Sequence, residues 1–456
     1  MNMQNTKLGI IIGALLLTNF SVSMAQNPII QTLFTADPAP IVLNDTLFLY
    51  TGHDEDEAPA KSYLMREYRL FTTTDMVNWT DHGAPLKISQ ISWSVNDASA
   101  AQVIERNGKY YWYFSTLNKD SPGVSVGVAV ADSPYGPFKD ALGKALITNN
   151  MTRYAPHSWD DLDPTVFIDD DGQAYLFWGN GACYWVKLNN DMISLKGTIQ
   201  HLDIKDKKAF SGKFTEAPWV YKRNGLYYLI YAAEFPENIS YSTAKKITGP
   251  WKAQGILMPT EKTSNTNHPG IIDYKGNSYF FYHNDALPGG HSYDRSVAVE
   301  QFKYKADGTI PQLHMTDTGI LKGVGTLNPY KRTEAETIAF SKGVKALEDK
   351  DRGVVITSIH HGDYIKVRDV NFGSTGPSSF KASASSRYDG GTIEIRIDGL
   401  EGRLIGTLNI AYTGEWENWK EFTTQTENVK DVHDVYFVFK GKEPHALFNF
   451  DYWQFR

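Results

Sequence analysis

The sequence predicts an all-β protein: a five-bladed β-propeller followed by a β-sandwich of the jelly-roll type. Two observations lead to this fold class. A hairpin signature recurs five times within the first 325 residues, and the pattern changes near residue 331. Aromatic residues make up 13% of the chain, and their flat side chains suit the pleated surface of strands.

Each repeat consists of a short apolar run, a polar turn and an aromatic-rich run. Asn-Gly and Asp-Gly pairs in the turns supply the positive φ angles that tight hairpins require. A second hairpin follows most of these units, so four strands per unit and five units make a five-bladed propeller. An ordinary β-sandwich is the alternative, but it gives no reason for two hairpin types to alternate. The first hairpins span 41–51, 102–116, 165–179, 219–233 and 270–284.

The first 25 residues have the pattern of a signal peptide. Lys7 precedes an apolar run from Leu8 to Leu17, and small residues follow as far as Ala25. The run is short for a membrane span, so an uncleaved anchor is the less favoured alternative. We expect a mature chain without a membrane span, located in the periplasm or secreted, with the propeller over 26–330.

The charge and the cysteine content exclude some classes of binding partner and of covalent cross-link. The formal net charge is −7 and no basic stripe is present, which argues against nucleic-acid binding. Cys183 is the only cysteine, so no disulfide framework can form.

Polar residues precede all five of the first hairpins. The radial symmetry of a propeller should bring them together at one mouth of the central channel. The spacing supports this, because nine residues separate Asp163 from Gly172 and nine separate Glu216 from Gly225. The five residues are Asp37, Asp97, Asp163, Glu216 and His268.

Four carboxylates around one axis repel one another unless they are solvated, bind a cation or take part in chemistry. Glycoside hydrolysis uses such a group, because it needs one ionised carboxylate and one protonated carboxylic acid. The alternative is that the Asp-Pro and Asn-His-Pro sequences are only turns at the entry to strands.

At these residues the sequence resembles glycoside hydrolase family 43, whose members are five-bladed propellers that invert the anomeric carbon. Ala36-Asp37-Pro38 matches the general base, and Asp163 in Asp161-Leu162-Asp163-Pro164 matches the aspartate that orients the acid and adjusts its pKa. Glu216 in Phe214-Thr215-Glu216-Ala217-Pro218 matches the general acid. The resemblance implies no organic cofactor.

The resemblance extends to residues around the sugar pocket. His268 matches a histidine that in many members faces a calcium ion, directly or through water, and Arg295 resembles an arginine that closes the pocket. His53, Trp93 and Asp97 are expected at the pocket rim or in substrate binding.

The sequence Gly52-His53-Asp54-Glu55, followed by Thr74-Asp75-Met76-Val77-Asn78-Trp79, is similar to the arabinoxylan arabinofuranohydrolase branch. This similarity implies a plant cell-wall substrate such as arabinoxylan, xylan or arabinan, and an L-arabinofuranosyl side chain as the sugar released. A β-xylosidase of the same fold is the first alternative. A noncatalytic carbohydrate-binding propeller and a scaffold for protein partners are rivals of different classes.

Residues 331–456 lack the propeller signature and show short alternating runs that predict a sandwich. The segment resembles carbohydrate-binding module family 6, through stretches such as Gly362-Asp363-Tyr364-Ile365 and Thr413-Gly414-Glu415-Trp416. Trp416 and Asn449 match its sugar-binding positions, although Trp416 can equally be a core residue.

The same resemblance implies a structural calcium in the sandwich. Glu334, Glu336 and Asp451 resemble its ligands, and carboxylate oxygens are the donors that calcium prefers. The aromatic residue expected before Gly362 is missing or displaced, since His360 and His361 stand there. Sugar binding by this module is therefore expected to be weak or lost.

Overall fold

The computed structural model describes residues 26–59, 61–261 and 264–456. Strands dominate throughout, and a single turn of 3-10 helix, η1 (Ile88–Gln90), is the only helix within these ranges. The predicted all-β class, with a five-bladed propeller and a sandwich, is confirmed. No helix in the described ranges has the length and apolar character needed to cross a membrane. The predicted signal peptide lies outside the described residues.

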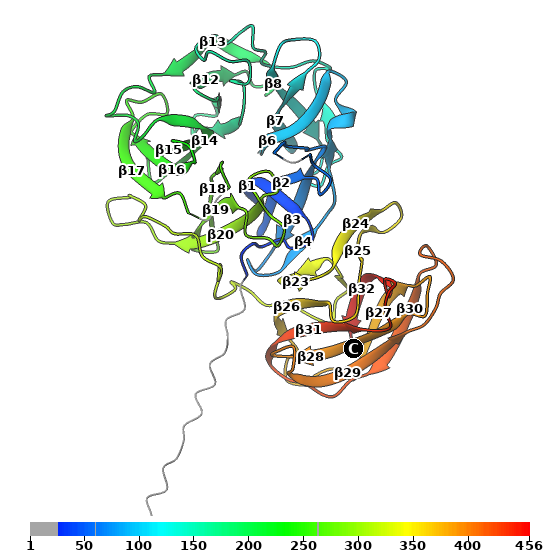
Figure 1. The fold of residues 1–456 in the computed structure, drawn as a ribbon. Helices are drawn as coiled ribbons and strands as arrows, with labels where there is room; N and C mark the ends of the chain where they lie inside the picture. Colours follow the sequence, from blue (N-terminus) through cyan, green and yellow to red (C-terminus); the bar gives the residue numbers. More distant parts are fainter. Residues whose placement is uncertain (1–25, 60, 262–263) are drawn as a thin grey trace, which may run out of the picture.

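The propeller consists of five antiparallel sheets that follow one another around a ring (Figure 1). Blade 1 contains β1 (Phe34–Leu43), β2 (Thr46–Asp54), β3 (Glu67–Thr73), β4 (Trp79–Asp81) and β5 (Leu86–Lys87). Blade 2 contains β6 (Ser94–Arg106), β7 (Lys109–Asn118), β8 (Val124–Ala131) and β9 (Lys139–Asp140). Blade 3 contains β10 (Thr165–Ile168), β11 (Ala174–Trp178), β12 (Cys183–Leu188) and β13 (Leu195–Leu202). Blade 4 contains β14 (Phe214–Arg223), β15 (Leu226–Ala233), β16 (Asn238–Ala244) and β17 (Lys252–Met258).

Blade 5 differs from the expected four strands, because among the described residues its sheet has only β18 (Gly270–Tyr274), β19 (Asn277–Asn284) and β20 (Ser296–Phe302). The chain segment that leads into β1, together with the start of β1, lies along β20 instead. The N–H of Ile29 donates to the carbonyl of Val297 at 2.9 Å, and the N–H of Thr35 donates to the carbonyl of Arg295 at 2.9 Å. The first residues of the propeller therefore complete its last blade, which closes the ring.

The turns of the first hairpins have the predicted backbone geometry. Asn107 and Gly108 have φ angles of 54° and 75°, and Asn224 and Gly225 have 49° and 73°. These positive angles match the right-handed twist of the flanking strands. Between blades, aromatic side chains form the core; for example, the ring of Trp112 meets Tyr50 edge-on, with centroids 4.8 Å apart.

The sandwich packs two antiparallel sheets around an apolar core of its own. One sheet contains β24 (Lys345–Asp349), β25 (Gly353–Thr357), β32 (Asn449–Phe455), β27 (Ser379–Ser385) and β30 (Lys420–Gln425), with β21 (Thr333–Glu334) on β32. The other contains β23 (Phe340–Lys342), β26 (Tyr364–Asn371), β31 (Val432–Lys440), β28 (Gly391–Ile397) and β29 (Arg403–Ile410).

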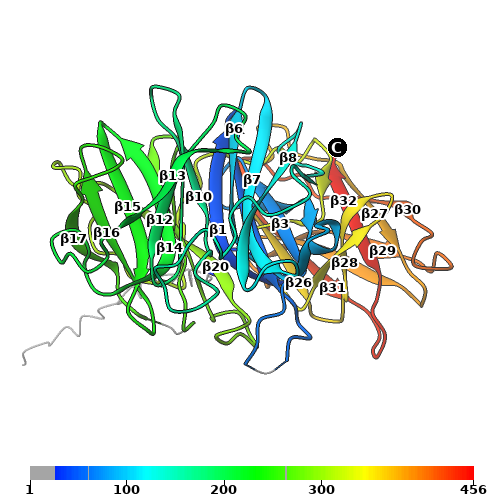
Figure 2. The same ribbon diagram turned by 90° about the horizontal axis from the view of Figure 1, so that it is seen from above.

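The sandwich is joined to blade 1 by one short strand pairing and by side-chain hydrogen bonds. The short strand β22 (Thr337–Ile338) pairs with β4, so that a segment after the propeller extends its first blade. Asn78 donates to the carbonyl of Arg368 at 2.9 Å and accepts its N–H at 2.8 Å. Both views show the sandwich beside blade 1 (Figures 1 and 2).

Candidate active site

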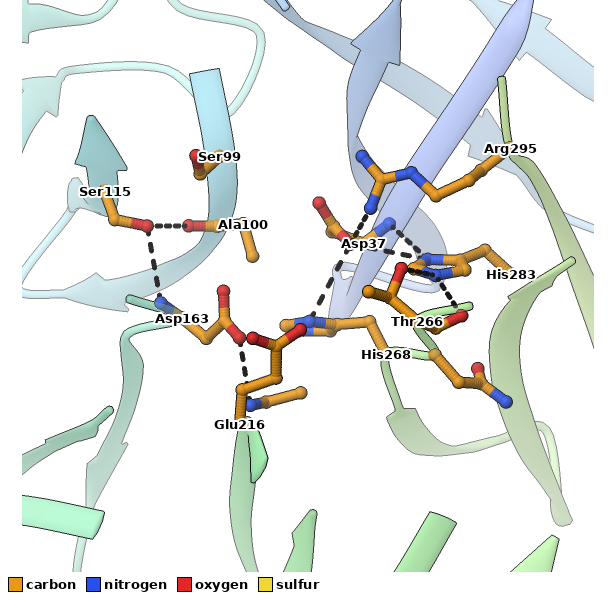
Figure 3. Close-up of polar contacts among 12 residues, drawn as sticks. Asp37, Ser99, Ala100, Ser115, Asp163, Glu216, Thr266, His268, His283 and Arg295 are labelled. Carbon is orange, nitrogen blue, oxygen red and sulfur yellow. Dashed lines mark hydrogen bonds and ion pairs between the residues drawn. The ribbon is translucent and has the colours of Figure 1, made fainter. Parts of the chain in front are cut away.

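A cavity of about 250 Å³ lies where the first strands of the five blades begin. This volume is at the small end of ligand pockets. Asp37, Asp163 and Glu216 all line the cavity, although they belong to blades 1, 3 and 4. Figure 3 shows their carboxyl groups turned toward a common space. The structure therefore brings together the three acids that the repeat pattern predicts at one mouth of the channel.

Local backbone irregularities turn these side chains into the cavity. The pairing of β1 with β2 shifts register between Ala36 and Ala39, and Asp37 has a φ of 54°. Asp163 has a φ of 59°. In β14 the register shifts on both sides of Glu216, and the next residue, Ala217, has a φ of 55°. Bulges and left-handed residues of this kind re-aim side chains, and they cluster at functional sites.

Asp37 lies against a cation. Nη1 of Arg295 is 3.2 Å from Oδ1 of Asp37, and the same guanidinium forms two bonds of 2.9 Å to the buried Asp54. Burial raises the pKa of Asp37, but the charge of Arg295 and the contact with His283 outweigh it. The pKa of Asp37 is therefore well below its ordinary value, and the residue is ionised at neutral pH.

Two histidines border the same aspartate. The N–H of Asp37 donates to Nδ1 of His283 at 3.2 Å, and Nε2 of His283 lies 3.0 Å from the carbonyl of Thr266. Nδ1 of His283 is also 3.3 Å from Oδ1 of Asp37, so the ring contacts both the backbone and the carboxylate of this residue. Nδ1 of His268 is 3.8 Å from Oδ1 of Asp37. Burial lowers the pKa of His268 to about 4, so its imidazole is neutral at pH 7.

Asp163 and Glu216 form a coupled pair on the other side of the cavity. Oδ2 of Asp163 accepts the N–H of Ala217 at 2.9 Å, and Asn180 donates to the carboxylate of Glu216. Burial, and then the charges of Glu216 and Asp37, raise the pKa of Asp163. Burial is also the largest cause that raises the pKa of Glu216 to about 7. The pair therefore keeps at least one proton close to neutral pH.

The other residues expected at the pocket divide into two groups. Arg295 and His268 line the cavity with the acids. Trp93, Asp97 and His53 do not line it, which corrects the expectation that they form its rim.

Trp93 is a core residue. It is 2% exposed, its Nε1 donates to Asp140 at 2.9 Å, and its ring stacks on Phe114. Asp97 lies outside the cavity because the pairing of β6 with β7 shifts register between Asn96 and Ser99. Ser99 and Ala100 are the residues of blade 2 that line the cavity.

His53 faces away from the acids. Its Nδ1 is 3.2 Å from Oε1 of Glu67, and it lines a separate cavity of about 360 Å³ between the propeller and the sandwich. The adjacent residue in β2, Asp54, faces Arg295.

Sequence reasoning missed Asn180 and His283, and it selected His53 as the site residue instead of the adjacent Asp54. Asn180, His283 and Asp54 all lie at or just after the second strand of a blade: β11, β19 and β2. In an antiparallel hairpin the end of the second strand lies beside the start of the first strand. The same repeat pattern could therefore have found them.

The sandwich has a cavity of its own, of about 560 Å³, between the loops at one end of its sheets. Tyr388 stacks on His445, with centroids 4.2 Å apart and ring planes 13° apart, and Tyr412 is 61% exposed. Trp416 and Asn449 do not line this cavity; Trp416 lies edge-on to Tyr388 at 5.9 Å. Stacked aromatic faces beside polar groups suit a sugar ring.

Comparison with known proteins places the chain in a family. The model of the glycosyl hydrolases family 43 matches residues 25–310, and that of carbohydrate binding module family 6 matches residues 334–456. The chain belongs to glycoside hydrolase family 43. It is therefore a glycoside hydrolase, and the rival classes of lectin and scaffold are set aside.

Relatives of the family 43 chain support the same assignment. An arabinoxylan arabinofuranohydrolase of Bacillus subtilis (strain 168) is 32% identical, over 94% of this chain and 92% of the relative. The crystal structure of a family 43 arabinoxylan arabinofuranohydrolase from Bacillus subtilis with cellotetraose has a TM-score of 0.81 at 30% identity, and the match covers 95% of this chain and 98% of that one. A xylosidase/arabinosidase of Bacteroides ovatus is 28% identical, over 61% of this chain and 94% of its own.

The three carboxylates expected to bind calcium in the sandwich affect one another, since burial and then the charges of Glu334 and Asp451 raise the pKa of Glu336. In the ranges that the structure describes, no group of three or more His, Cys, Asp or Glu side chains is arranged to hold a metal ion, at His268 or elsewhere. Arg352 bonds Asp451 at 2.6 Å, and Arg332 makes bonds of 2.9 and 2.8 Å to Glu334. Glu336 lines a narrow space against Asp81 of blade 1, and its buried Oε2 has no hydrogen-bond partner among the described residues. Arginines thus neutralise two of the three predicted ligands.

Proposed function

We propose that this glycoside hydrolase removes α-L-arabinofuranosyl side chains from arabinoxylan or a related hemicellulose, with inversion at the anomeric carbon. Two relatives known as arabinoxylan arabinofuranohydrolases, which align over 94% of the chain, support this substrate class. The small cavity favours a single terminal sugar over an extended chain.

The proposed reaction is a single displacement. The carboxylate of Asp37 takes a proton from a water molecule as the water oxygen attacks the anomeric carbon. Glu216 gives its proton to the glycosidic oxygen as the bond to the leaving group breaks. Asp163 contributes by keeping the Asp163–Glu216 pair partly protonated, and Arg295 by keeping Asp37 ionised.

One observation carries this proposal: the cavity holds carboxyl groups whose pKa values are pushed apart. The Arg295 guanidinium lowers the pKa of Asp37, whereas burial raises the pKa of Glu216 to about 7. A base and an acid that coexist at neutral pH are what inverting hydrolysis needs.

The test is proton NMR of wheat arabinoxylan incubated with the enzyme. We expect free arabinose to appear first as the anomer opposite to that of the substrate linkage. The Asp37→Ala and Glu216→Ala variants, shown to be folded by circular dichroism, should release none. Retention of configuration, or full activity in either variant, would overturn the proposed roles.

A β-xylosidase activity is the second candidate. The xylosidase/arabinosidase relative and several solved β-xylosidases share the propeller. The same NMR experiment on xylo-oligosaccharides distinguishes the two candidates, because a β-xylosidase releases xylose from chain ends.

We also propose that the chain acts in the periplasm or outside the cell. The signal-peptide pattern of residues 1–25 and the polymeric substrate support this location.

A further inference from the structure

The hairpin of β24 and β25 in the sandwich lies directly against blade 1. Glu348 in this hairpin accepts bonds from Arg69 at 3.2 Å, from Lys87 at 2.8 Å and from the N–H of Ala84 at 2.5 Å. Gly83 makes room for it, since a Cβ at that position would lie 2.9 Å from Oε1 of Glu348. One acidic side chain of the sandwich therefore has three partners in the propeller.

A second contact reaches the loop between β2 and β3. Nζ of Lys345 is 2.8 Å from Oδ2 of Asp56 in this loop. Between Lys345 and Glu348, Ala346 packs against the apolar cores of both the propeller and the sandwich. The hairpin is thus fixed to the propeller by ion pairs on both sides of a shared apolar contact.

From Glu348, a continuous series of contacts leads toward the catalytic cavity. Arg69 bonds Glu67 at 3.1 Å, and Glu67 bonds His53 at 3.2 Å. Arg69 is 4% exposed and also holds Asp81 through two bonds of 2.9 and 2.8 Å. These contacts fix the end of β2, where the next residue after His53 is Asp54.

Both contacts converge on Arg295. Asp54, at the end of β2, holds its guanidinium through two bonds. The β2–β3 loop, which Lys345 contacts through Asp56, contains Tyr63 and Met65. The ring centroid of Tyr63 is 4.7 Å from the guanidinium of Arg295, and the sulfur of Met65 is 3.3 Å from its Nη2. Arg295 in turn contacts Asp37, so the position of the proposed base depends on elements that the sandwich touches.

We propose that the sandwich is a positioning element of the catalytic cavity, in which Lys345 and Glu348 hold β2 and the β2–β3 loop so that Arg295 stays on Asp37. This role is separate from any sugar binding by the sandwich. It rests on the proposed role of Asp37 as the base, and that role is tested independently by the activity of the wild-type chain and of Asp37→Ala.

The test compares wild type with Lys345→Met, Glu348→Gln and the double variant in the full-length chain. The substrate is 4-nitrophenyl α-L-arabinofuranoside, which is too small to bridge the cavity and the sandwich loops. We expect kcat/KM of the double variant to fall about three- to tenfold, the scale on which packed networks couple distant sites. We also expect the acidic limb of its pH profile to move to higher pH, because a loosened Arg295 lowers the pKa of Asp37 less.

Two controls distinguish an effect on the position of Arg295 from a general loss of contact between the two domains. Arg403→Gln, which removes an exposed pair with Glu427 inside the sandwich, should change neither the rate nor the pH profile. The charge-reversed pair Lys345→Asp with Asp56→Lys should restore the activity that Lys345→Asp alone loses. All assays are run at least 15 °C below the measured Tm of each variant.

An unchanged acidic limb together with unchanged kcat/KM in the double variant would overturn the proposal, even if its Tm falls. Should the double variant fail to fold, the single variants and the charge reversal decide the question by the same readouts. An inactive wild-type chain would count against the proposed function and not against the positioning role.

Discussion

The carboxylate of Asp163 accepts the backbone N–H of Ala217, the residue that follows Glu216, at 2.9 Å. This bond ties blade 3 to blade 4 at the cavity and holds the two acids at a fixed separation. Because both carboxyls are buried and repel each other when ionised, the proton that they share is retained to higher pH than on an isolated glutamate.

Replacement of Asp163 by Asn removes one member of this pair. The two carboxyls then no longer share a proton, so we expect Glu216 to lose its proton more easily and the basic limb of kcat/KM to move to lower pH. Rates on arabinoxylan at pH 7 should fall by about 10²-fold or more, the scale of general acid catalysis. Measured pH profiles on an aryl arabinofuranoside check the shift, and an unmoved basic limb would show that Asp163 does not control the acid.

Glu216→Gln separates protonation of the leaving group from the rest of the reaction. An activated aryl leaving group departs without a proton, whereas the alcohol of a polysaccharide does not. We expect the variant to lose about 10²- to 10⁴-fold on arabinoxylan and much less on 4-nitrophenyl α-L-arabinofuranoside. Parallel kcat/KM measurements provide the comparison, and equal losses on both substrates would contradict the assignment of Glu216 as the acid.

The same substitution should change stability in a pH-dependent way. Burial raises the pKa of Glu216 to about 7 in the folded chain, while an unfolded glutamate ionises near its ordinary value of about 4.3. The folded state thus binds more protons between these values, so the contribution of Glu216 to the free energy of unfolding falls as pH rises from about 4 to 7.

Glu216→Gln should therefore be more stable than wild type at pH 8 and nearly equal to it at pH 4. Glu216 is partly exposed to the cavity, and solvent screens part of the cost, so we expect a gain of about 1–2 kcal/mol. Urea unfolding at the two pH values measures it. The exposed Glu417→Gln serves as the control and should show no such dependence; a gain that is the same at both pH values would point to a cause other than ionisation.

The repeat pattern was sufficient to predict which acids meet, because radial symmetry brings equivalent positions of each blade to the axis. Asp37, Asp163 and Glu216 line one cavity although 126 and 53 residues separate them along the chain. It was not sufficient for blade 2, where bulges in β6 replace Asp97 by Ser99 and Ala100. Bulges depend on the pairing of two strands, and the sequence of one strand does not reveal them.

The sequence also does not show which of two neighbouring residues at the end of a strand faces the site. His53 and Asp54 are adjacent, yet only Asp54 faces the site, because successive side chains in a strand point to opposite faces. Local sequence patterns also could not predict which basic residues pair with the carboxylates of the sandwich. Arg352, which neutralises Asp451, lies 99 positions away in the sequence.

The sandwich cavity leads to a final prediction. Tyr388 presents a ring stacked on His445 at the cavity wall, whereas Trp416 lies outside the lining. If this cavity holds a sugar ring against Tyr388, Tyr388→Ala should weaken binding to insoluble arabinoxylan about tenfold, which corresponds to about 1.4 kcal/mol, and Trp416→Ala should weaken it less.

Depletion assays in a Glu216→Ala background, where the polymer is not consumed, measure this binding. Tyr135→Ala is the matched control, since Tyr135 is a similarly exposed tyrosine on the propeller, at 48%, and should leave binding unchanged. A larger loss in Trp416→Ala than in Tyr388→Ala would place the sugar on the other side of the loop, at the position that the sequence resemblance implies.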